Sequence, residues 1–459
     1  MDIDSILHLY KKTYFNMPRA IQGFFGELYG SIPLNIRYGN QYNNHKKILE
    51  QFENADKQFQ LDYMFNKTYE TLQFSYENIS YYKKVFDQHD FKIQDFKSLD
   101  DMKKVPYLTK EIIQNEISSL FTNKIDKPVV IHTGGSTFTP TTFYVPLNTS
   151  RAKEKAYTLH IFGKIGYKYR DKTLVLRSLD TSDETNGKFW DYEHVNNSLR
   201  ISSNHINIIY IERILKEVEQ FKPKFIYAYP SELIFFINAC SHIGINKLKG
   251  IKGVLLTSEI VYQSQIDKIT SFFNCKVLSH YGHSERVSVG FRIDNQPYQF
   301  LNAYGLTRIV DNEIISTSFD NFVMPFINYK TKDFVMEKYN FFEGSDVVRS
   351  VENIEGRLQE FLVTKNGNLK SVVSVGIGHY DGYKYVKAAQ YYQDRPGHIT
   401  IKIESEYPKK IDSAKIIKQL EEYVNYEISF DVKFVEKIEK TSRGKWKHCI
   451  QKLNIENYR

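Results

Sequence analysis

Two patterns of hydrophobic and polar positions divide the chain, and the change comes near residue 128. Before it, polar stretches carry apolar residues at helical spacing over 46–59 and 63–86, with Asn and Asp breaks between them. The first hundred residues are therefore predicted to be mainly helical. After it, short β-branched runs alternate with amphipathic stretches of helix length, which is typical of a wound α/β sheet.

The second pattern is clearest between residues 208 and 281. It predicts, in order, a helix over 208–221, a strand over 224–229, a helix opened by Pro230 and Ser231, a strand over 252–258, a helix with Ile266, Ile269 and Phe273, and a strand over 276–281. Short connections imply right-handed crossovers and parallel pairing. Such sheets bind ligands in the loops that follow their strands, which here are 229–231, 257–259 and 281–285.

Past Arg308 the pattern predicts antiparallel pairing, with short strands on either side of an Asp311-Asn312 turn. A second unit begins near Gly356. It is predicted to be a small α+β domain, with strands over 360–364, 385–392, 398–404 and 431–438 and a helix over 412–427. We therefore expect a large domain over 1–356, mainly helical over 1–100, and a small domain over 357–459.

Composition narrows the class of protein further. Lys+Arg 62 against Asp+Glu 54 gives a net charge of +8 over 459 residues, too small an excess for a dedicated nucleic-acid binder. Cys240, Cys275 and Cys449 are too few and too scattered for a disulfide framework or a four-sulfur zinc site, so a reducing cytoplasm is expected. No window reaches the length of a membrane helix and no signal peptide is visible, so we expect no membrane insertion.

A hydroxyl-rich glycine loop, Thr133-Gly-Gly-Ser-Thr-Phe-Thr-Pro140, follows the apolar strand predicted at 128–132. Glycines let backbone amides approach a phosphate, and hydroxyls can donate to its oxygens. The loop lacks the Gly-Lys-Ser/Thr of the Walker motif. The alternative is a Ser/Thr/Gly loop that only joins two strands.

Two further motifs offer an aromatic ring and carboxylates. In Tyr281-Gly-His-Ser-Glu285 a purine could stack on Tyr281, and Glu285 could hold the magnesium of a nucleotide triphosphate. The alternative is a strand end with a helix-capping Ser284. Asp333 could accept from ribose hydroxyls, or it could be a single exposed Asp before a strand.

Two basic motifs lie in the last quarter of the chain. Gly356-Arg357 places a cation where the chain can pivot, and Lys440-Thr-Ser-Arg-Gly-Lys445 is a glycine-bearing basic loop whose Lys445 could reach an anionic transition state. The alternatives are a turn with a solvated Arg and a solvated basic tail.

In sequence order these motifs resemble the core motifs of the adenylate-forming superfamily. More narrowly, the chain resembles the phenylacetate-CoA ligase branch, which includes CapK-type proteins of capsular polysaccharide gene clusters. The resemblance runs from about Val129 to Leu453. It implies a large domain with wound mixed and parallel sheets and a small, mobile α+β C-terminal domain.

The resemblance also implies a role for each matching residue. The nucleotide would be bound by Thr133, Gly134, Gly135, Ser136, Thr137, Ser258, Glu259, Tyr281, Gly282, Asp333 and Arg357. Glu285 would hold Mg²⁺, Lys445 would serve adenylation and Glu360 would be the hinge. This chain departs from the family at Phe138, where the loop has glycine, and at Asn328 and Lys332, which replace Arg and Gly.

The implied activity is ATP-dependent activation of a small carboxylic acid as an acyl-adenylate, followed by transfer to an acceptor thiol or amine. ATP and Mg²⁺ are the expected cofactors, with coenzyme A where the acceptor is a thiol. An amine or hydroxyl on a sugar is an equal alternative, giving an amide or ester. The carboxylate pocket is expected between residues 227–229, Thr257 and the strand ending at Tyr281. A non-catalytic scaffold or nucleotide sensor is the rival that Phe138 favours.

Overall fold

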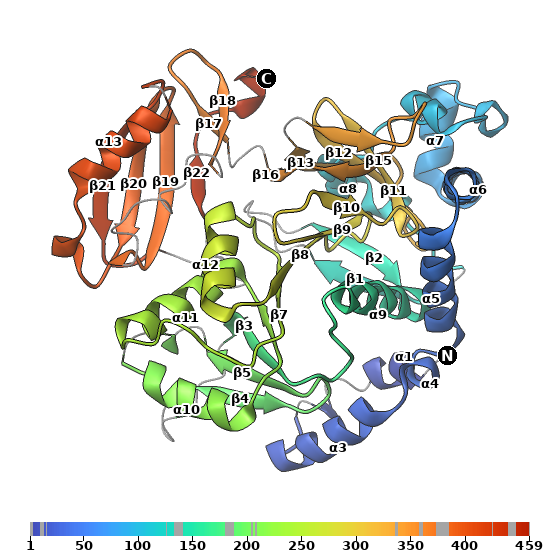
Figure 1. Cartoon of the computed structure of the whole chain (residues 1–459). Helices are drawn as coiled ribbons and strands as arrows, with labels where there is room; N and C mark the ends of the chain where they lie inside the picture. The colour runs from blue at the N-terminus through green and yellow to red at the C-terminus, as the bar shows by residue number, and fades with distance from the viewer. Residues whose placement is uncertain are drawn as a thin grey trace.

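Figure 1 shows a large domain with a smaller C-terminal unit beside it, in orange and red. The computed structural model describes residues 3–9, 13–14, 16–124, 126–132, 141–179, 188–202, 205–206, 209–335, 338–357, 361–372, 385–424, 426–438 and 447–458. The expected class, α/β with several sheets and a small C-terminal domain, is confirmed. Among the described residues no helix is both long and apolar enough to cross a bilayer.

The first 120 residues are mainly helical, as the periodicity predicts. The helices are α1 (Ile3–Leu9), α3 (Arg19–Ser31), α4 (Leu34–Arg37), α5 (Gly39–Asn54), α6 (Lys57–Asn78), α7 (Ser80–Gln88) and α8 (Lys110–Glu116), with short 3₁₀ turns at Ile93–Asp95, Leu99–Lys104 and Ile117–Ser119. The predicted bounds are wrong, because α6 begins at residue 57 rather than 63. Asp56 caps it by accepting from the backbone N–H of Phe59 at 2.8 Å.

The core of the large domain is a ten-stranded sheet in the order β14-β15-β10-β9-β8-β7-β6-β3-β5-β4. Its strands are β3 (Thr173–Leu179), β4 (Trp190–Glu193), β5 (Ser198–Ser202), β6 (Phe225–Ala228), β7 (Gly253–Thr257), β8 (Lys276–Gly282), β9 (Val289–Ile293), β10 (Tyr298–Phe300), β14 (Tyr339–Phe341) and β15 (Val348–Val351). The five central strands from β5 to β8 pair in parallel, and the outer strands pair antiparallel. The parallel strands predicted at 224–281 are therefore confirmed.

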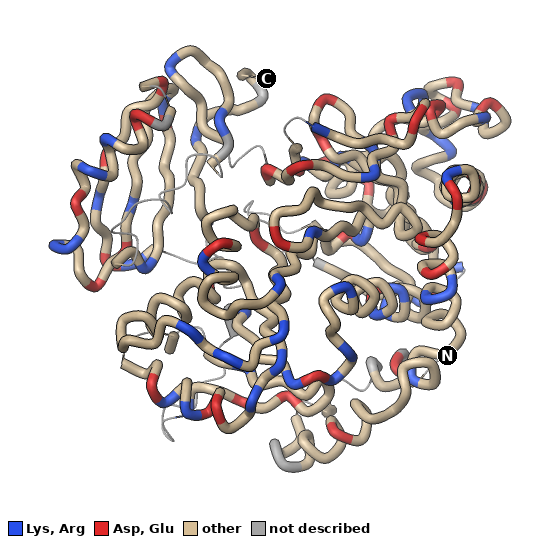
Figure 2. Tube along the Cα trace, viewed as in Figure 1, with Lys and Arg blue, Asp and Glu red and all other residues tan. Residues whose placement is uncertain are grey.

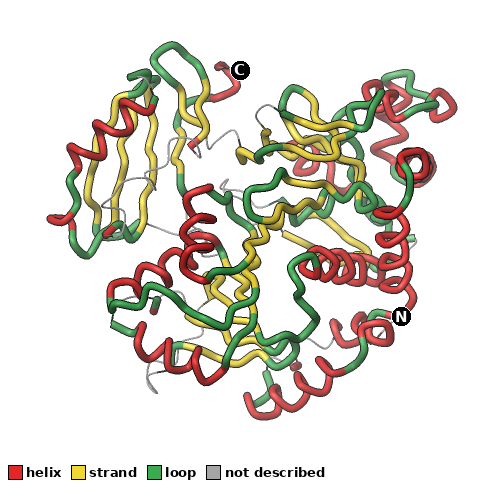
Figure 3. Tube along the Cα trace, viewed as in Figure 1, coloured by secondary structure: helices red, strands yellow, loops and turns green. Residues whose placement is uncertain are grey.

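Helices cover both faces of the central strands, as Figures 1 and 3 show. The connecting helices α10 (Ile211–Phe221), α11 (Pro230–His242) and α12 (Gln263–Phe273) pack on one face with Leu176, Ile226 and Val254. The opposite face carries Phe225, Leu255 and Leu278 and shares its core with α9 (Leu147–Gly163). Residues that alternate along each strand thus enter two different cores.

Two smaller sheets complete the large domain. The hairpin of β1 (Pro128–His132) and β2 (Thr142–Pro146) flanks the glycine loop. The second sheet has the order β11-β12-β13-β16, with β11 (Gly305–Val310), β12 (Glu313–Ser318), β13 (Tyr329–Val335) and β16 (Ile354–Arg357). The predicted Asp311-Asn312 turn joins β11 to β12 with both residues at positive φ, 50° and 63°.

The C-terminal unit is a four-stranded sheet with one helix against it. The sheet has the order β21-β20-β19-β22, formed by β19 (Ala388–Arg395), β20 (His398–Glu404), β21 (Ser429–Val435) and β22 (Cys449–Gln451). Helix α13 (Ser413–Tyr423) is capped by Asp412, and a hairpin of β17 (Phe361–Val363) and β18 (Leu369–Ser371) lies beside the sheet. The α+β prediction holds, although β18 and β22 carry no strand signal that the sequence analysis recognised.

Candidate active site

The three predicted ligand loops lie at one edge of the large domain. Strands β6, β7 and β8 are neighbours and pair in parallel, so residues 229–231, 257–259 and 281–285 follow their carboxyl ends side by side. Strand β9 runs back from Val289, antiparallel to β8. No helix follows Ser284, and the alternative of a helix-capping serine there is wrong.

Asp333 is brought to this edge from the neighbouring four-stranded sheet. It lies inside β13 and is only 8% exposed, so the alternative of an exposed Asp before a strand is wrong. The Tyr281 hydroxyl donates to Asp333 Oδ2 at 3.0 Å and lies 2.6 Å from His283 Nε2, which is itself 3.2 Å from the same Oδ2. Two side chains, 52 and 50 positions before Asp333 in the sequence, therefore fix one oxygen of this carboxylate.

Glu285 lies at the end of the same loop. Its Oε1 accepts from the hydroxyl of Tyr329, the first residue of β13, at 3.2 Å. The half-buried carboxylate is thus oriented by the strand that carries Asp333. Within the described part of the chain, no group of three or more His, Cys, Asp or Glu side chains is placed to hold a metal ion.

The loop after β7 is held by a helix terminus. Ser258 has φ +69°, a conformation that non-glycine residues adopt uncommonly and that occurs at strained functional turns. The Glu259 carboxylate accepts from the backbone N–H of Ser231 at 3.1 Å and from its hydroxyl at 3.0 Å. Glu259 therefore caps the first turn of α11, and this capping fixes the loop predicted to line the adenine.

Two positions that depart from the family pattern have structural partners. Asn328 is buried; its amide donates to the carbonyls of Met102 and Val105 and its oxygen accepts from Arg308 at 2.9 Å. Lys332 stands where the pattern has glycine, and its φ of +61° is in the region that glycine favours. Its ammonium pairs with Glu111 at 2.8 Å, so the side chain is directed to α8.

Several predicted site residues lie outside the described residues. These are Thr133, Gly134, Gly135, Ser136 and Thr137, with Phe138, the hinge Glu360 and the lysine Lys445. Strands β1 and β2 are paired up to His132 and Thr142, so the glycine loop joins adjacent ends of a hairpin. Arg357 is described by its backbone, which pairs in β16 with Asp333 of β13.

Sequence reasoning missed four side chains near the same edge of the sheet, on the side covered by α9: Arg177, His280, Glu154 and Tyr304. Arg177 at the end of β3 has its guanidinium over the rings of Tyr227 and Tyr229, and His280 of β8 faces the same side. Across from them Glu154 of α9 accepts from the Tyr304 hydroxyl. The available signal was an arginine at an inward-facing position of a β-branched run.

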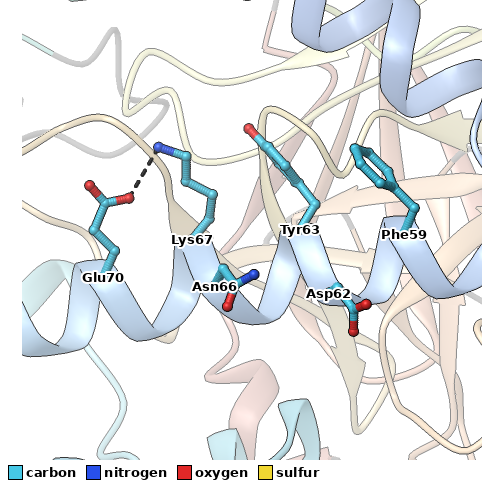
Figure 4. Close-up of a pocket in the computed structure, with 6 residues that line it drawn as sticks. All are labelled: Phe59, Asp62, Tyr63, Asn66, Lys67 and Glu70. Carbon is cyan, nitrogen blue, oxygen red and sulfur yellow. Dashed lines mark hydrogen bonds and ion pairs between the residues drawn. The ribbon is translucent and has the colours of Figure 1, made fainter.

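A separate surface pocket lies along one face of α6 (Figure 4). It is lined by Phe59, Asp62, Tyr63, Asn66, Lys67 and Glu70. Lys67 pairs with Glu70 and with Asp320, each at 3.1 Å, so its charge is already neutralised. The pocket contains no predicted site residue, and charges of both signs are interspersed over the elements drawn in Figure 2.

Comparison with solved structures identifies the architecture. A 2-hydroxyisobutyryl-CoA ligase in the postadenylation state, in complex with 2-HIB-AMP, superposes with a TM-score of 0.63 at 15% identity, covering 84% of this chain and 88% of that one. The same ligase with 2-HIB-AMP and CoA in the thioesterification state gives a TM-score of 0.52 at 14% identity, covering 87% and 91%. The chain has the fold of the adenylate-forming ligases.

Sequence comparison agrees with this fold. Residues 362–452 match the CapK C-terminal domain family. Protein CapK of Staphylococcus aureus is 22% identical over 461 residues, covering 96% of this chain and 99% of that protein. The resemblance to CapK-type members of the superfamily is confirmed, and it includes the helical first hundred residues, where the sequence analysis found no motif.

Proposed function

We propose that this chain is an AMP-forming ligase that activates a small carboxylic acid. The carboxylate oxygen attacks the α-phosphorus of ATP, the bond between the α- and β-phosphates breaks, and pyrophosphate leaves with the electron pair. The observation that carries the proposal is the convergence of Tyr281, His283, Glu285 and Asp333 at the carboxyl edge of an adenylate-forming fold. The nucleotide-binding roles of the matching residues belong to this proposal.

The Asp333 carboxylate is proposed to accept hydrogen bonds from the ribose hydroxyls. One carboxylate oxygen is fixed by Tyr281 and His283, so the group is oriented before a nucleotide arrives. Tyr281 is proposed to contact the adenine. Because its hydroxyl is bonded to Asp333, the positions of the ring and the carboxylate are coupled.

Glu285 fits the magnesium role on its chemistry. A single carboxylate with substrate phosphates is a common protein contribution to a Mg²⁺ site, because this ion keeps most of its water and is seldom held by a cage of side chains. Glu285 Oε1 accepts one hydrogen bond, from Tyr329, and a carboxylate has lone pairs for more. The ion, when bound, neutralises charge on the phosphates.

The second step is proposed to transfer the acyl group to a nucleophile. A thiol, amine or hydroxyl attacks the acyl carbon, its proton is lost, and AMP leaves. Coenzyme A is one acceptor and an amine or hydroxyl of a sugar is the other, in cytoplasmic steps of surface polysaccharide synthesis. The small domain beginning at residue 357 would pivot at Glu360, exchanging Lys445 for the acceptor.

Carboxylate-dependent exchange of labelled pyrophosphate into ATP tests the first step. Glu285→Gln is expected to lower exchange at limiting magnesium by about 100-fold, the usual cost of removing one electrostatic contact to the transition state. Glu352→Gln makes the same change at an exposed position and should have no effect. Lys445→Ala should lose exchange similarly and yet convert a supplied acyl-adenylate to product.

Two results would contradict the proposal. Retention of wild-type exchange by Glu285→Gln at limiting magnesium would remove the metal role from that residue. Tight ATP binding without exchange on any acid would favour the rival function of a nucleotide sensor, for which Phe138 is the supporting residue.

A further inference from the structure

A row of side chains crosses the central sheet at its carboxyl edge, on the face covered by α9. Register sets the row, because residues paired across parallel strands point to the same side. Val175 pairs with Tyr227 and Thr257 pairs with His280, and Arg177 is two residues beyond Val175. Arg177, Tyr227, Thr257 and His280 therefore share the α9 face.

Arg177 has an unusual environment for an arginine. Its guanidinium carbon lies 4.4 Å from the ring centroid of Tyr227 and 5.2 Å from that of Tyr229, so two aromatic faces orient it. The side chain is half-buried, and its buried Nε has no hydrogen-bond partner. Among the described residues no carboxylate forms an ion pair with it. A cation that is partly withdrawn from water without an ion-pair partner carries a cost, and an anionic ligand group would reduce that cost.

The described groups that face Arg177 do not supply this anion. Glu154, the acidic residue whose charge reaches His280 from α9, already accepts from the Tyr304 hydroxyl. His280 is neutral at physiological pH, because burial lowers its pKa to about 4, with a smaller contribution from the charge of Arg177. Arg286, on the same side, donates to the hydroxyl of Ser150. Among the described residues of this site, the Arg177 guanidinium is thus the one cation without a hydrogen-bonded partner, and it lies beside a wall of Tyr227, Phe162 and His280.

We propose that the acid activated by this protein is a dicarboxylic acid, and that Arg177 binds the carboxylate that does not react. This inference rests on the proposed function, which places the reacting carboxylate beside the nucleotide site at the end of β8. The Arg177 guanidinium lies over β6, two strand spacings or roughly 10 Å from β8. One carboxylate cannot reach both places. Allowing for the ion pair itself, about 6 Å separates the two groups, as in a six-carbon diacid or a benzenedicarboxylic acid.

The test compares diacids with their half-esters, which keep the shape and lose one charge. Adipate, suberate and the three benzenedicarboxylates, each against its monomethyl ester, are the probes in pyrophosphate exchange with the full-length chain. Wild type should have a kcat/KM for the preferred diacid at least about 10-fold above that of its half-ester, as expected for a charge-assisted pair. Arg177→Ala should abolish this preference by lowering the diacid value alone, and Arg177→Lys should restore part of it.

Arg349→Ala is the matched control, because Arg349 also stacks on a ring, 4.8 Å from Phe342, but is exposed on β15. Calorimetric titration of the same diacids into wild type and Arg177→Ala gives a readout that does not need turnover. Exchange that favours half-esters, or an equal loss on both members of a pair in Arg177→Ala, overturns the inference and leaves the proposed function standing. Diacid binding that depends on Arg177 without exchange on any acid supports the inference and removes the proposed reaction. If the protein shows no exchange and binds no diacid, the inference and the proposed function are both overturned.

Discussion

The hydroxyl of Tyr281 gives a direct test of how Asp333 is positioned. Tyr281→Phe keeps the ring and its edge contacts with His283 and Phe300, at centroid distances of 4.8 and 5.8 Å, and removes one atom. The lost bond to Asp333 Oδ2 is charge-assisted and contributes about 1.5–3 kcal/mol where it is well buried. Tyr281 is only half-buried, so we take the lower limit.

If the hydrogen bond that orients Asp333 contributes about 1.5 kcal/mol to nucleotide binding, its loss lowers the affinity for ATP by roughly 10-fold. If Asp333 binds the ribose, the KM for ATP in pyrophosphate exchange should rise by about that factor, and kcat should change by less than about threefold. KM should change more than kcat because the hydrogen bond contributes equally to binding in the ground state and in the transition state. His283→Gln should act in the same direction, since His283 Nε2 lies near the same Oδ2.

Tyr76→Phe is the matched control for this experiment. Tyr76 also donates to an aspartate, Asp87 at 2.9 Å, but on the exposed surface between α6 and α7. It should leave the KM for ATP unchanged. The reasoning is refuted if Tyr281→Phe, folded as judged by its denaturation midpoint, has a KM for ATP within twofold of wild type.

Two further predictions concern stability. Lys153 is buried and donates to the carbonyls of Tyr304 and Phe319 at 2.7 and 2.8 Å and to Asp320 at 3.1 Å. Lys153→Met should therefore lower the free energy of unfolding, measured by urea denaturation at pH 7, by about 3–5 kcal/mol. Lys67 is a more exposed partner of Asp320, so Lys67→Met should lower it by less than about 1 kcal/mol. Equal costs for the two variants would contradict the buried-pair argument. Burial of His45 lowers its pKa to about 4, so as the pH falls this histidine is protonated in the unfolded chain before it is protonated in the folded one. Its contribution to the free energy of unfolding is therefore fully present above pH 6.5, and up to about 3 kcal/mol of it is lost between pH 6.5 and 4. His45→Gln should reduce that acid-dependent loss, and an unchanged pH dependence of the denaturation midpoint would exclude His45 as a contributor.

The wound sheet could be predicted because each strand and helix between 224 and 281 has its own local pattern. The first helices could not be bounded in the same way. The Asn and Asp residues in this stretch indicate a break between two helices but not its position, which is set by one hydrogen bond, from the N–H of Phe59 to the Asp56 carboxylate. Strands β18 and β22 were missed because each has three residues, too few for an alternating pattern.

The motifs predicted residues that lie together at one edge of the sheet, but not how their side chains interact. An exposed Asp333 was one alternative because the residues that precede it are polar, whereas in the structure β13 is paired on both sides, with β12 and β16. Its bond to Tyr281 joins residues in two different sheets, which no local window contains. Arg177 was missed for the same reason, since the tyrosines beneath it follow 50 residues later.

The two faces of the central sheet explain why polar groups can be concentrated at this edge. On the face under α10, α11 and α12 the residues are apolar as far as the carboxyl ends of the strands, as in Leu176, Ala228 and Leu256. On the α9 face the same strands change from apolar residues to Arg177, Thr257 and His280 within one alternation. A folded core does not tolerate such groups unless they have partners, so this change marks where an open edge replaces the core. The cost of an unpaired Arg177 persists only in the absence of a ligand, and an acid bridging Arg177 and the nucleotide edge would stabilise the site on binding. We therefore expect the preferred diacid to raise the thermal midpoint of wild type more than that of Arg177→Ala, and the half-ester to raise both equally.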